Sequence, residues 1–306
     1  MTVFDPLKLR DQLSPGQLAQ MACILEVSAR KPGNVHPGRS FRDTHFIDFL
    51  LSASVIAPAM DQARSNGLGR TILEAVRATR KVVATNTNLG MILLFAPLAA
   101  VPPGQDLRGG VVQILGSTTV NDARQVYQAI REAQPGGLGE ASEQDIAKEP
   151  TVNLLEAMRL AANRDLVAAQ YANGYAEVFD LALPALRAGM NDLPLESAIV
   201  FCYLHVLANR QDTLIARKQG KVEAAEASRR AAKVLESGWP NASEGCTALA
   251  GFDDWLRAEG HARNPGTTAD LVAACLFVAL GDGTIPLPRP MDPFRGPPDH
   301  FPSDRD

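Results

Sequence analysis

The stretch Leu89-Gly-Met-Ile-Leu-Leu-Phe-Ala-Pro-Leu-Ala-Ala-Val101 is the longest apolar run of this 306-residue chain. A helix that crosses a membrane needs roughly 20 apolar residues. This run has only 13 residues and contains Gly90 and Pro97. We therefore expect a helix that is buried inside a folded protein, not a membrane span.

Helical patterns continue on both sides of this run. Ser14 and Pro15 have the residue types of an N-cap and a first helical position, and Lys31-Pro32-Gly33 ends the helix that follows. Apolar residues then recur at helical spacing along most of the chain. The predicted helices are Pro15–Ala29, His45–Arg64, Gly69–Ala84, Leu89–Ala100, Asn121–Ala133, Asn153–Asn163, Leu166–Arg187, Leu195–Asn209, Val222–Ser237, Ser243–Glu259 and Thr268–Leu280.

Strand signals are scarce, and Val111–Leu115 is the one short run that fits either a strand or a buried helix. The sequence therefore predicts an all-α fold with a single helical bundle-like domain over residues 1–283. We expect its core around Leu89–Ala100, Leu195–Ala208 and Leu271–Leu280. The acidic, glycine-containing connection Gln134–Pro150 is predicted to be a linker or flap, and residues 284–306 an irregular proline-rich tail.

Charge and cysteine usage exclude several classes of protein. Thirty basic against 34 acidic side chains give a net charge of −4, so no global positive field favours nucleic acid or an anionic membrane. The four cysteines form no CxxC pair, and the charged N-terminus lacks the apolar core of a signal peptide. We expect reduced cysteines and a cytoplasmic protein, and homo-oligomerisation stays open.

Familiar nucleotide and hydrolase motifs are absent, including GxxxxGK[ST], GxGxxG, HExxH and GxSxG. The first polar cluster runs from Glu26 to Gly38. Glu26 lies in the last turn of a predicted helix, where the helix dipole disfavours a carboxylate. It is therefore a candidate functional acid, although an i,i+4 pair with Arg30 would also explain it. His36 in the following loop has a structural interpretation of equal weight.

Three further clusters lie at predicted helix ends. Asn86-Thr87-Asn88 separates two apolar runs and fits either a helix N-cap or a ligand contact. Asp212 with Arg217-Lys218 is typical of a solvated surface patch. Asp270 lies in the first turn of an apolar helix, where an acid can simply stabilise the helix dipole.

The order of these clusters carries more information than any one of them. Five short motifs occur over about residues 20 to 283: Glu26…Lys31-Pro32-Gly33-Asn34-Val35, Asp43…Phe49-Leu50…Ser52-Ala53, Asn86-Thr87-x-x-Gly90, Asp212-Thr213…Arg217, and Pro265-Gly266-x-x-Ala269-Asp270-Leu271. In this order they resemble the triphosphoribosyl-dephospho-CoA synthase family. The resemblance implies an all-helical enzyme that transfers the triphosphoribosyl unit of ATP to the 2′-hydroxyl of dephospho-CoA and releases adenine.

The chain departs from the family pattern at two places. The usual Asn-Thr-His-Lys-Gly is replaced by Asn86-Thr87-Asn88-Leu89-Gly90, so an imidazole and an ammonium are lost. An aspartate that usually follows Gly-x-His is here preceded by Phe41-Arg42, at Asp43. Both departures bear on the identity of the substrate.

Transfer of a ribosyl group requires stabilised positive charge, an assisted leaving group and a deprotonated hydroxyl. Glu26 is the predicted general base. Mg²⁺ is the expected cofactor, because phosphates bring this ion and carboxylates complete its shell; its predicted ligands, directly or through the second shell, are Asp43, Asp212 and Asp270. The predicted substrate and phosphate contacts are Lys31, Asn34, His36, Asn86, Thr87, Asn88, Arg217 and Lys218.

Two alternatives stay open from the sequence. One is phosphoribosyl transfer from phosphoribosyl pyrophosphate to a pterin-type or polyol-type precursor of a one-carbon cofactor, which needs the same donor chemistry. The lost His-Lys pair favours this alternative. The other is a non-catalytic helical module that binds a nucleotide without turnover.

Overall fold

The computed structural model describes residues 13–136 and 143–286, and these residues form helices with no β-strand. The predicted all-α fold is therefore confirmed. In chain order the helices are α2 Pro15–Ser28, α3 Phe46–Asp61, α4 Ala63–Asn66, α5 Leu68–Val82, α6 Leu89–Ala100, α7 Leu107–Gly116, α8 Val120–Ala133, α9 Leu154–Ala161, α10 Leu166–Asn173, the π-helical η1 Glu177–Ala182, α11 Leu183–Asp192, α12 Leu195–Asn209, α13 Thr213–Gln219, α14 Lys221–Glu236, α15 Ser243–Arg257 and α16 Gly266–Gly281.

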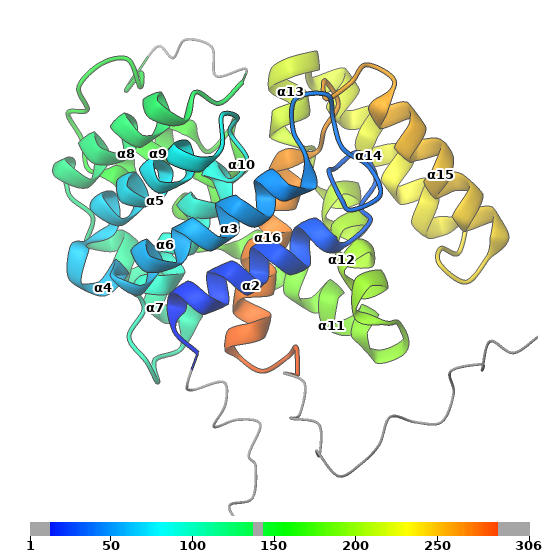
Figure 1. The fold of residues 1–306 in the computed structure, drawn as a ribbon, viewed down its shortest axis with the longest axis horizontal. Helices are drawn as coiled ribbons and strands as arrows, with labels where there is room; N and C mark the ends of the chain where they lie inside the picture. Colours follow the sequence, from blue (N-terminus) through cyan, green and yellow to red (C-terminus); the bar gives the residue numbers. More distant parts are fainter. Residues whose placement is uncertain (1–12, 137–142, 287–306) are drawn as a thin grey trace, which may run out of the picture.

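Helix α16 lies at the centre of the molecule (Figure 1). All residues from Leu271 to Leu280 are buried, and α16 packs against α2, α6 and α12. Helices α5, α8 and α9 lie on one side of it, and α13, α14 and α15 on the other. The core predicted around three apolar helices is thus confirmed. Among the described helices, none combines the length and apolar character needed to cross a bilayer.

The helix boundaries agree with the sequence pattern where the apolar periodicity is strong. Helices α6 and α12 begin and end as predicted, and the ambiguous run Val111–Leu115 lies within α7. The prediction of one helix over Leu166–Arg187 is wrong, because Gly174 and Tyr175 both adopt left-handed backbone angles, with φ of 69° and 64°. Helix α13 was not predicted, since its seven residues are too few to show a period.

Tyr171 and Tyr175, which lie next to the break between α10 and η1, both contact α6. Pro97 has no N–H, so the carbonyl of Leu93 receives no hydrogen bond from within its own helix. The hydroxyl of Tyr171 donates to this carbonyl at 2.6 Å, and that of Tyr175 donates to the Leu94 carbonyl at 2.9 Å. The two tyrosines therefore complete the helix that forms one wall of the site described below.

Replacing Tyr171 by phenylalanine is expected to lower the free energy of unfolding by about 1–3 kcal/mol, because the Leu93 carbonyl would be buried without a partner. Urea unfolding followed by circular dichroism measures the change. Tyr127→Phe is the matched control: its hydroxyl donates to the partly exposed Gln144 carbonyl at 2.7 Å, which water can replace. Equal losses of unfolding free energy in Tyr171→Phe and Tyr127→Phe would contradict the stabilising role of the Tyr171 hydroxyl.

The last described residues pack onto the domain. Ile285 is buried, and the Arg187 guanidinium donates to Thr284 Oγ1 at 3.1 Å and pairs with Asp282. Residues 284–286 thus pack on the surface of the helices, whereas the rest of the predicted tail lies outside the described residues. The division into one domain and a tail stays a prediction.

Candidate functional site

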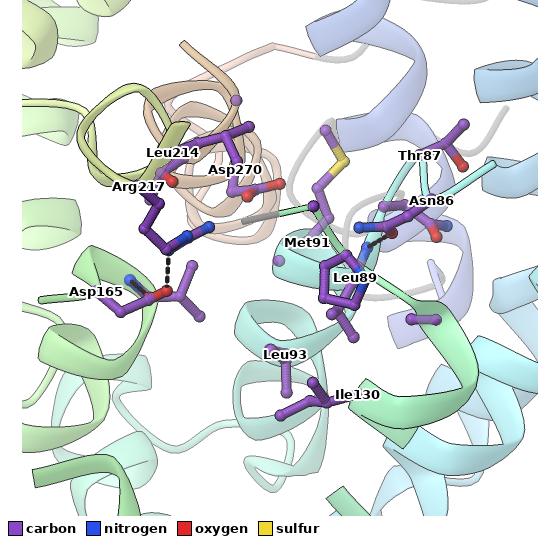
Figure 2. A pocket seen from close by; sticks show the side chains of 18 of the residues that line it. Asn86, Thr87, Leu89, Met91, Leu93, Ile130, Asp165, Leu214, Arg217 and Asp270 are labelled. Carbon is purple, nitrogen blue, oxygen red and sulfur yellow. Dashed lines mark hydrogen bonds and ion pairs between the residues drawn. The ribbon is translucent and has the colours of Figure 1, made fainter. Parts of the chain in front are cut away.

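A pocket of about 570 Å³ opens between the two sides of the molecule. The N-terminal ends of α6, α10 and α16 contribute to its wall. Nine residues predicted from the sequence lie in its lining: Glu26, Asn34, Asp43, Asn86, Thr87, Asn88, Arg217, Lys218 and Asp270. In Figure 2, Asp270 is seen between Arg217 on one side and Asn86 on the other. The fold therefore brings together residues from both ends of the chain.

The pocket has a polar and an apolar part. Below Asp270 in Figure 2, Leu93 and Ile130 form an apolar wall. Further apolar lining residues come from α6, α9 and α10 and include Met91, Leu154, Ala157, Met158, Val167 and Ala168. Such a cavity, largely apolar with a few convergent polar groups, is typical of a small-molecule site.

Glu26 lies near the end of α2 with its side chain only 3% exposed. One carboxylate oxygen, Oε1, lies 3.0 Å from the ammonium of Lys31. Burial raises the pKa of the Glu26 carboxyl above its ordinary value, and the charge of Lys31 opposes that rise. The result is a buried carboxylate at the pocket wall that is paired with one cation.

The Asn86–Gly90 segment begins α6. Asn86 Oδ1 accepts the N–H of Leu89 at 3.1 Å, so the helix-capping interpretation holds for Asn86. Thr87 Oγ1 lies 2.6 Å from Ser52 Oγ and ties the segment to α3. Asn88 is buried, and its Nδ2 has no hydrogen-bond partner within the described residues.

Asp270 packs directly on the backbone of Gly90. A Cβ atom at position 90 would overlap the Asp270 carboxylate, so only glycine lets this acid approach α6. Burial raises the pKa of the Asp270 carboxyl well above its ordinary value; the charges of Glu26, Asp212 and Asp165 add to the rise, and Arg217 opposes it. An acid held in this way has a strong energetic preference for a cation.

Asn34 is held by hydrogen bonds to residues from the C-terminal part of the chain. Its Nδ2 donates to Asn264 Oδ1 at 2.5 Å, and its carbonyl accepts from Arg257 on α15 at 2.5 Å. The remaining polar atom, Oδ1, is buried without a hydrogen-bond partner in the described part of the chain. Buried polar atoms without partners are rare in folded proteins. Asn34 Oδ1 and Asn88 Nδ2 are thus two such atoms in residues that line the pocket.

Two basic side chains of α13 line the pocket. Arg217 pairs with Asp165, the N-cap residue of α10, at 2.5 Å, and its Nε has no partner among the described residues. Lys218 donates to the His261 carbonyl at 3.2 Å, and burial lowers its pKa. Asp43 lies at the rim, 3.5 Å from the His261 ring. This side of the pocket can bind an anion.

The sequence model of the CitG family, described as ATP:dephospho-CoA triphosphoribosyl transferase, matches residues 12–287. The chain belongs to this family. Among solved structures it is similar to a candidate triphosphoribosyl-dephospho-CoA synthase from Archaeoglobus fulgidus, with a TM-score of 0.60 and 26% identity; the match covers 76% of this chain and 99% of that one. No curated protein sequence gives a match. The family resemblance stated from the sequence motifs is thus confirmed.

Two residues that the family motif suggested as substrate contacts lie outside the pocket lining. Lys31 is fully buried behind Glu26, with its ammonium bound to Glu26 and to main-chain carbonyls. His36 Nδ1 accepts the N–H of Gly38 at 3.2 Å and so stabilises a turn. The structure thus corrects both predictions of direct contact, because a motif in sequence does not show which way a side chain points.

Asp212 has a structural role in this member of the family. Its Oδ1 accepts the N–H groups of Leu214 and Ile215 at 2.8 and 3.0 Å. Its Oδ2 accepts the N–H and hydroxyl of Thr268 at 2.7 and 2.8 Å. The carboxylate therefore joins the first turns of α13 and α16 and does not line the pocket.

The three predicted metal ligands do not gather into one site. In the described ranges, no group of three or more His, Cys, Asp or Glu side chains is placed to hold a metal ion. Asp43 and Asp270 both line the pocket, Asp43 at its exposed rim and Asp270 in its buried part, whereas the Asp212 carboxylate binds N–H groups of α13 and α16. The expectation of a three-aspartate site is therefore corrected, and Asp270 is left as its candidate member.

Asp212→Asn is expected to lower the free energy of unfolding by about 2 kcal/mol or more, because an amide NH₂ cannot accept the Thr268 N–H. Urea unfolding measures the loss. Asp106→Asn, which alters an exposed N-cap bound only to Gly109, is the control and should cost less than about 1 kcal/mol. A fully stable Asp212→Asn variant would contradict the structural role.

Sequence reasoning missed several lining residues. Asp165 precedes an apolar run and looks like an ordinary N-cap, so nothing near it indicated a partner at Arg217. The apolar wall from α6, α8, α9 and α10 was indistinguishable from core residues, because only the packing of four helices leaves a space between them. Asn264 immediately precedes the Pro265–Leu271 motif, yet its contact with Asn34 depends on the fold.

Proposed function

We propose that this chain transfers the triphosphoribosyl group of ATP to a hydroxyl of a coenzyme precursor such as dephospho-CoA, with release of adenine. The observation that supports this most directly is that residues of the family's motifs line one pocket. Two of these residues, Asn34 and Asn88, have a buried polar atom without a hydrogen-bond partner in the described chain. ATP is the proposed donor, and a cytoplasmic location is proposed with it.

In the proposed reaction, the bond between ribose C1 and adenine N9 breaks, and its electron pair goes to the base. The acceptor oxygen forms the new bond to C1, and its proton passes to Glu26. Adenine takes up one proton from water as it leaves, and Glu26 then gives its proton to the hydroxide that remains, so charges and atoms balance. Glu26 is the proposed base because it is the carboxylate in the wall that a lysine holds close to its charged form.

The charges of the pocket favour a donor that enters with a cation. Among described lining residues, five acids (Glu26, Asp43, Glu143, Asp165 and Asp270) face four basic side chains (Arg80, Arg164, Arg217 and Lys218). No net positive charge is therefore available for a triphosphate. We propose that Mg²⁺ neutralises the phosphates, as in other phosphate sites where one or two carboxylates complete the coordination.

Asp270 fits this ion best. Its carboxylate lines the pocket, has no hydrogen bond or ion pair within the described chain, and pays a burial cost that a cation would remove. When bound, Mg²⁺ would offset phosphate charge. Arg217 and Lys218 would bind phosphate oxygens from the other side, while Asn34 and Asn88 would hold ribose hydroxyls.

The test is direct. Purified protein is incubated with ATP and Mg²⁺, alone and with dephospho-CoA, and free adenine and the enlarged acceptor are followed by chromatography with mass detection. Acceptor-dependent adenine release supports the proposal. Product formation only from phosphoribosyl pyrophosphate would favour the alternative donor, and binding of ATP without any release would favour a non-catalytic module.

A further inference from the structure

The side chain of Lys31 has an unusual position for a lysine that follows a helix. It is fully buried, with Nζ 3.0 Å from Glu26 Oε1. The same ammonium donates to the main-chain carbonyls of Glu26 and of Ala29, the latter at 3.1 Å. A lysine has three N–H donors. All three therefore have acceptors inside the protein, and none is left for a phosphate.

The turn after α2 directs this side chain inward. Gly33 has a φ of 76°, and a Cβ there would lie 2.7 Å from Leu256. Tyr203 on α12 donates to the Pro32 carbonyl at 2.8 Å, and the Gly33 N–H donates to Asp253 on α15 at 2.7 Å. Two helices distant in sequence thus fix the Lys31-Pro32-Gly33 turn against the end of α2.

Helix capping alone does not explain this arrangement. A lysine can satisfy the last carbonyls of a helix while its ammonium stays in water. Burying the charge costs several kcal/mol unless a partner compensates it. Here the charged partner is Glu26, which itself lines the pocket. The cost of burying the Lys31 ammonium is therefore best explained by the effect of its charge on Glu26.

Three further acidic groups interact with Glu26: Asp270 on α16, Tyr203 on α12 and Cys23 on α2. Burial and the charge of Glu26 raise the pKa values of all three, so none of them stabilises the charge of Glu26. Burial disfavours the ionised form of Glu26 itself. Among the groups that interact with Glu26 in the described structure, Lys31 is the one that stabilises its charge.

We propose that Lys31 is a positioning residue that keeps the Glu26 carboxylate ionised and directed into the pocket, without contacting either substrate. This inference rests on the proposed function, in which Glu26 accepts the proton of the acceptor hydroxyl. Lys31 acts before and during that step, and it neither gains nor loses a proton.

Lys31→Met removes the ammonium while keeping a long apolar stem. At pH 7 we expect kcat for adenine release to fall by about 10-fold to 100-fold, and the acid limb of its pH profile to move upward by about one unit or more, because Glu26 loses its stabilising charge. The dissociation constant of ATP with Mg²⁺, from calorimetry, should stay within about twofold. Lys81→Met, on the exposed end of α5, is the control for a lost lysine.

Two results would overturn the proposal. A weaker binding of ATP with an unshifted pH profile would make Lys31 a substrate contact. An equal loss of kcat at every pH would make it a structural residue only. The double variant Glu26→Gln/Lys31→Met removes the whole buried pair and should fold even where the single variant does not. Its rate should equal that of Glu26→Gln alone, and additive losses would count against the proposal.

A measurement without turnover separates this proposal from the proposed function. Infrared difference spectra against the wild type at neutral pH should show one additional protonated carboxylic acid in Lys31→Met and none in the double variant. If the wild type releases no adenine, the proposed function fails and the spectra still decide whether Lys31 controls the charge of Glu26. Absence of this band in a folded Lys31→Met variant would refute the inference.

Discussion

Glu26→Gln is expected to lower the rate of acceptor-dependent adenine release by about 100-fold or more, the usual range for a lost general base. Glutamine keeps the shape of the side chain and can still meet Lys31, but it cannot take up the hydroxyl proton. The dissociation constant of ATP with Mg²⁺ should be nearly unchanged, because the glutamine side chain occupies the same place in the pocket wall. Single-turnover kinetics and calorimetry measure the two quantities separately.

Glu196→Gln is the matched control for this variant. Glu196 is also a glutamate next to the α2 turn, bound to Arg30 at 2.5 Å, but its side chain is exposed and lies outside the pocket lining. Its rate and binding should both stay near those of the wild type. A rate for Glu26→Gln within a few-fold of the control would remove Glu26 from the chemistry and leave it a structural partner of Lys31.

Asp270→Asn is expected to reduce Mg²⁺-dependent binding of ATP by roughly 100-fold, because it removes the carboxylate proposed to contact the ion. Calorimetric titration with and without Mg²⁺ measures this loss. Gly90→Ala should have a similar effect while keeping the charge, because its Cβ displaces the Asp270 carboxylate. Unchanged Mg²⁺-dependent binding in both variants would assign Asp270 to structure.

Asp270→Asn should also raise the free energy of unfolding in the absence of metal, and this gain should depend on pH. The folded-state pKa of Asp270 is raised, mainly by burial, so the folded wild type binds more protons than the unfolded chain and loses stability as pH rises. Asp270→Asn lacks this loss. The gain in stability of this variant over the wild type should be absent below the pKa of aspartate in the unfolded chain, about 3.9. It should grow as the pH rises through the pKa of Asp270 in the folded protein. Melting curves in chelator at pH 4 and pH 8 test the sign.

The family motifs located the site better than any single residue did. Asn86, Asp270 and Glu26 each had an ordinary structural explanation, and for Asn86 that explanation also holds, since it caps α6. The fold places these three residues in the lining of one pocket, whereas Lys31 and Asp212 from the same motifs lie outside it. Their chemical roles stay predictions, because position in a pocket does not establish what a group does there.

The amino-acid sequence alone determined the helical class, the three core helices and nine of the residues that line the pocket. These follow from local signals, since apolar periodicity, caps and prolines act within a few turns. It did not determine the break at Gly174 and Tyr175, where the Tyr171 and Tyr175 hydroxyls bind carbonyls of another helix. Nor could it separate Asp212 from Asp270 or direct Lys31 inward. Those outcomes depend on contacts between segments distant in sequence, and only the packing of α13, α16 and the end of α2 decided which carboxylates were used within the protein and which faced the pocket.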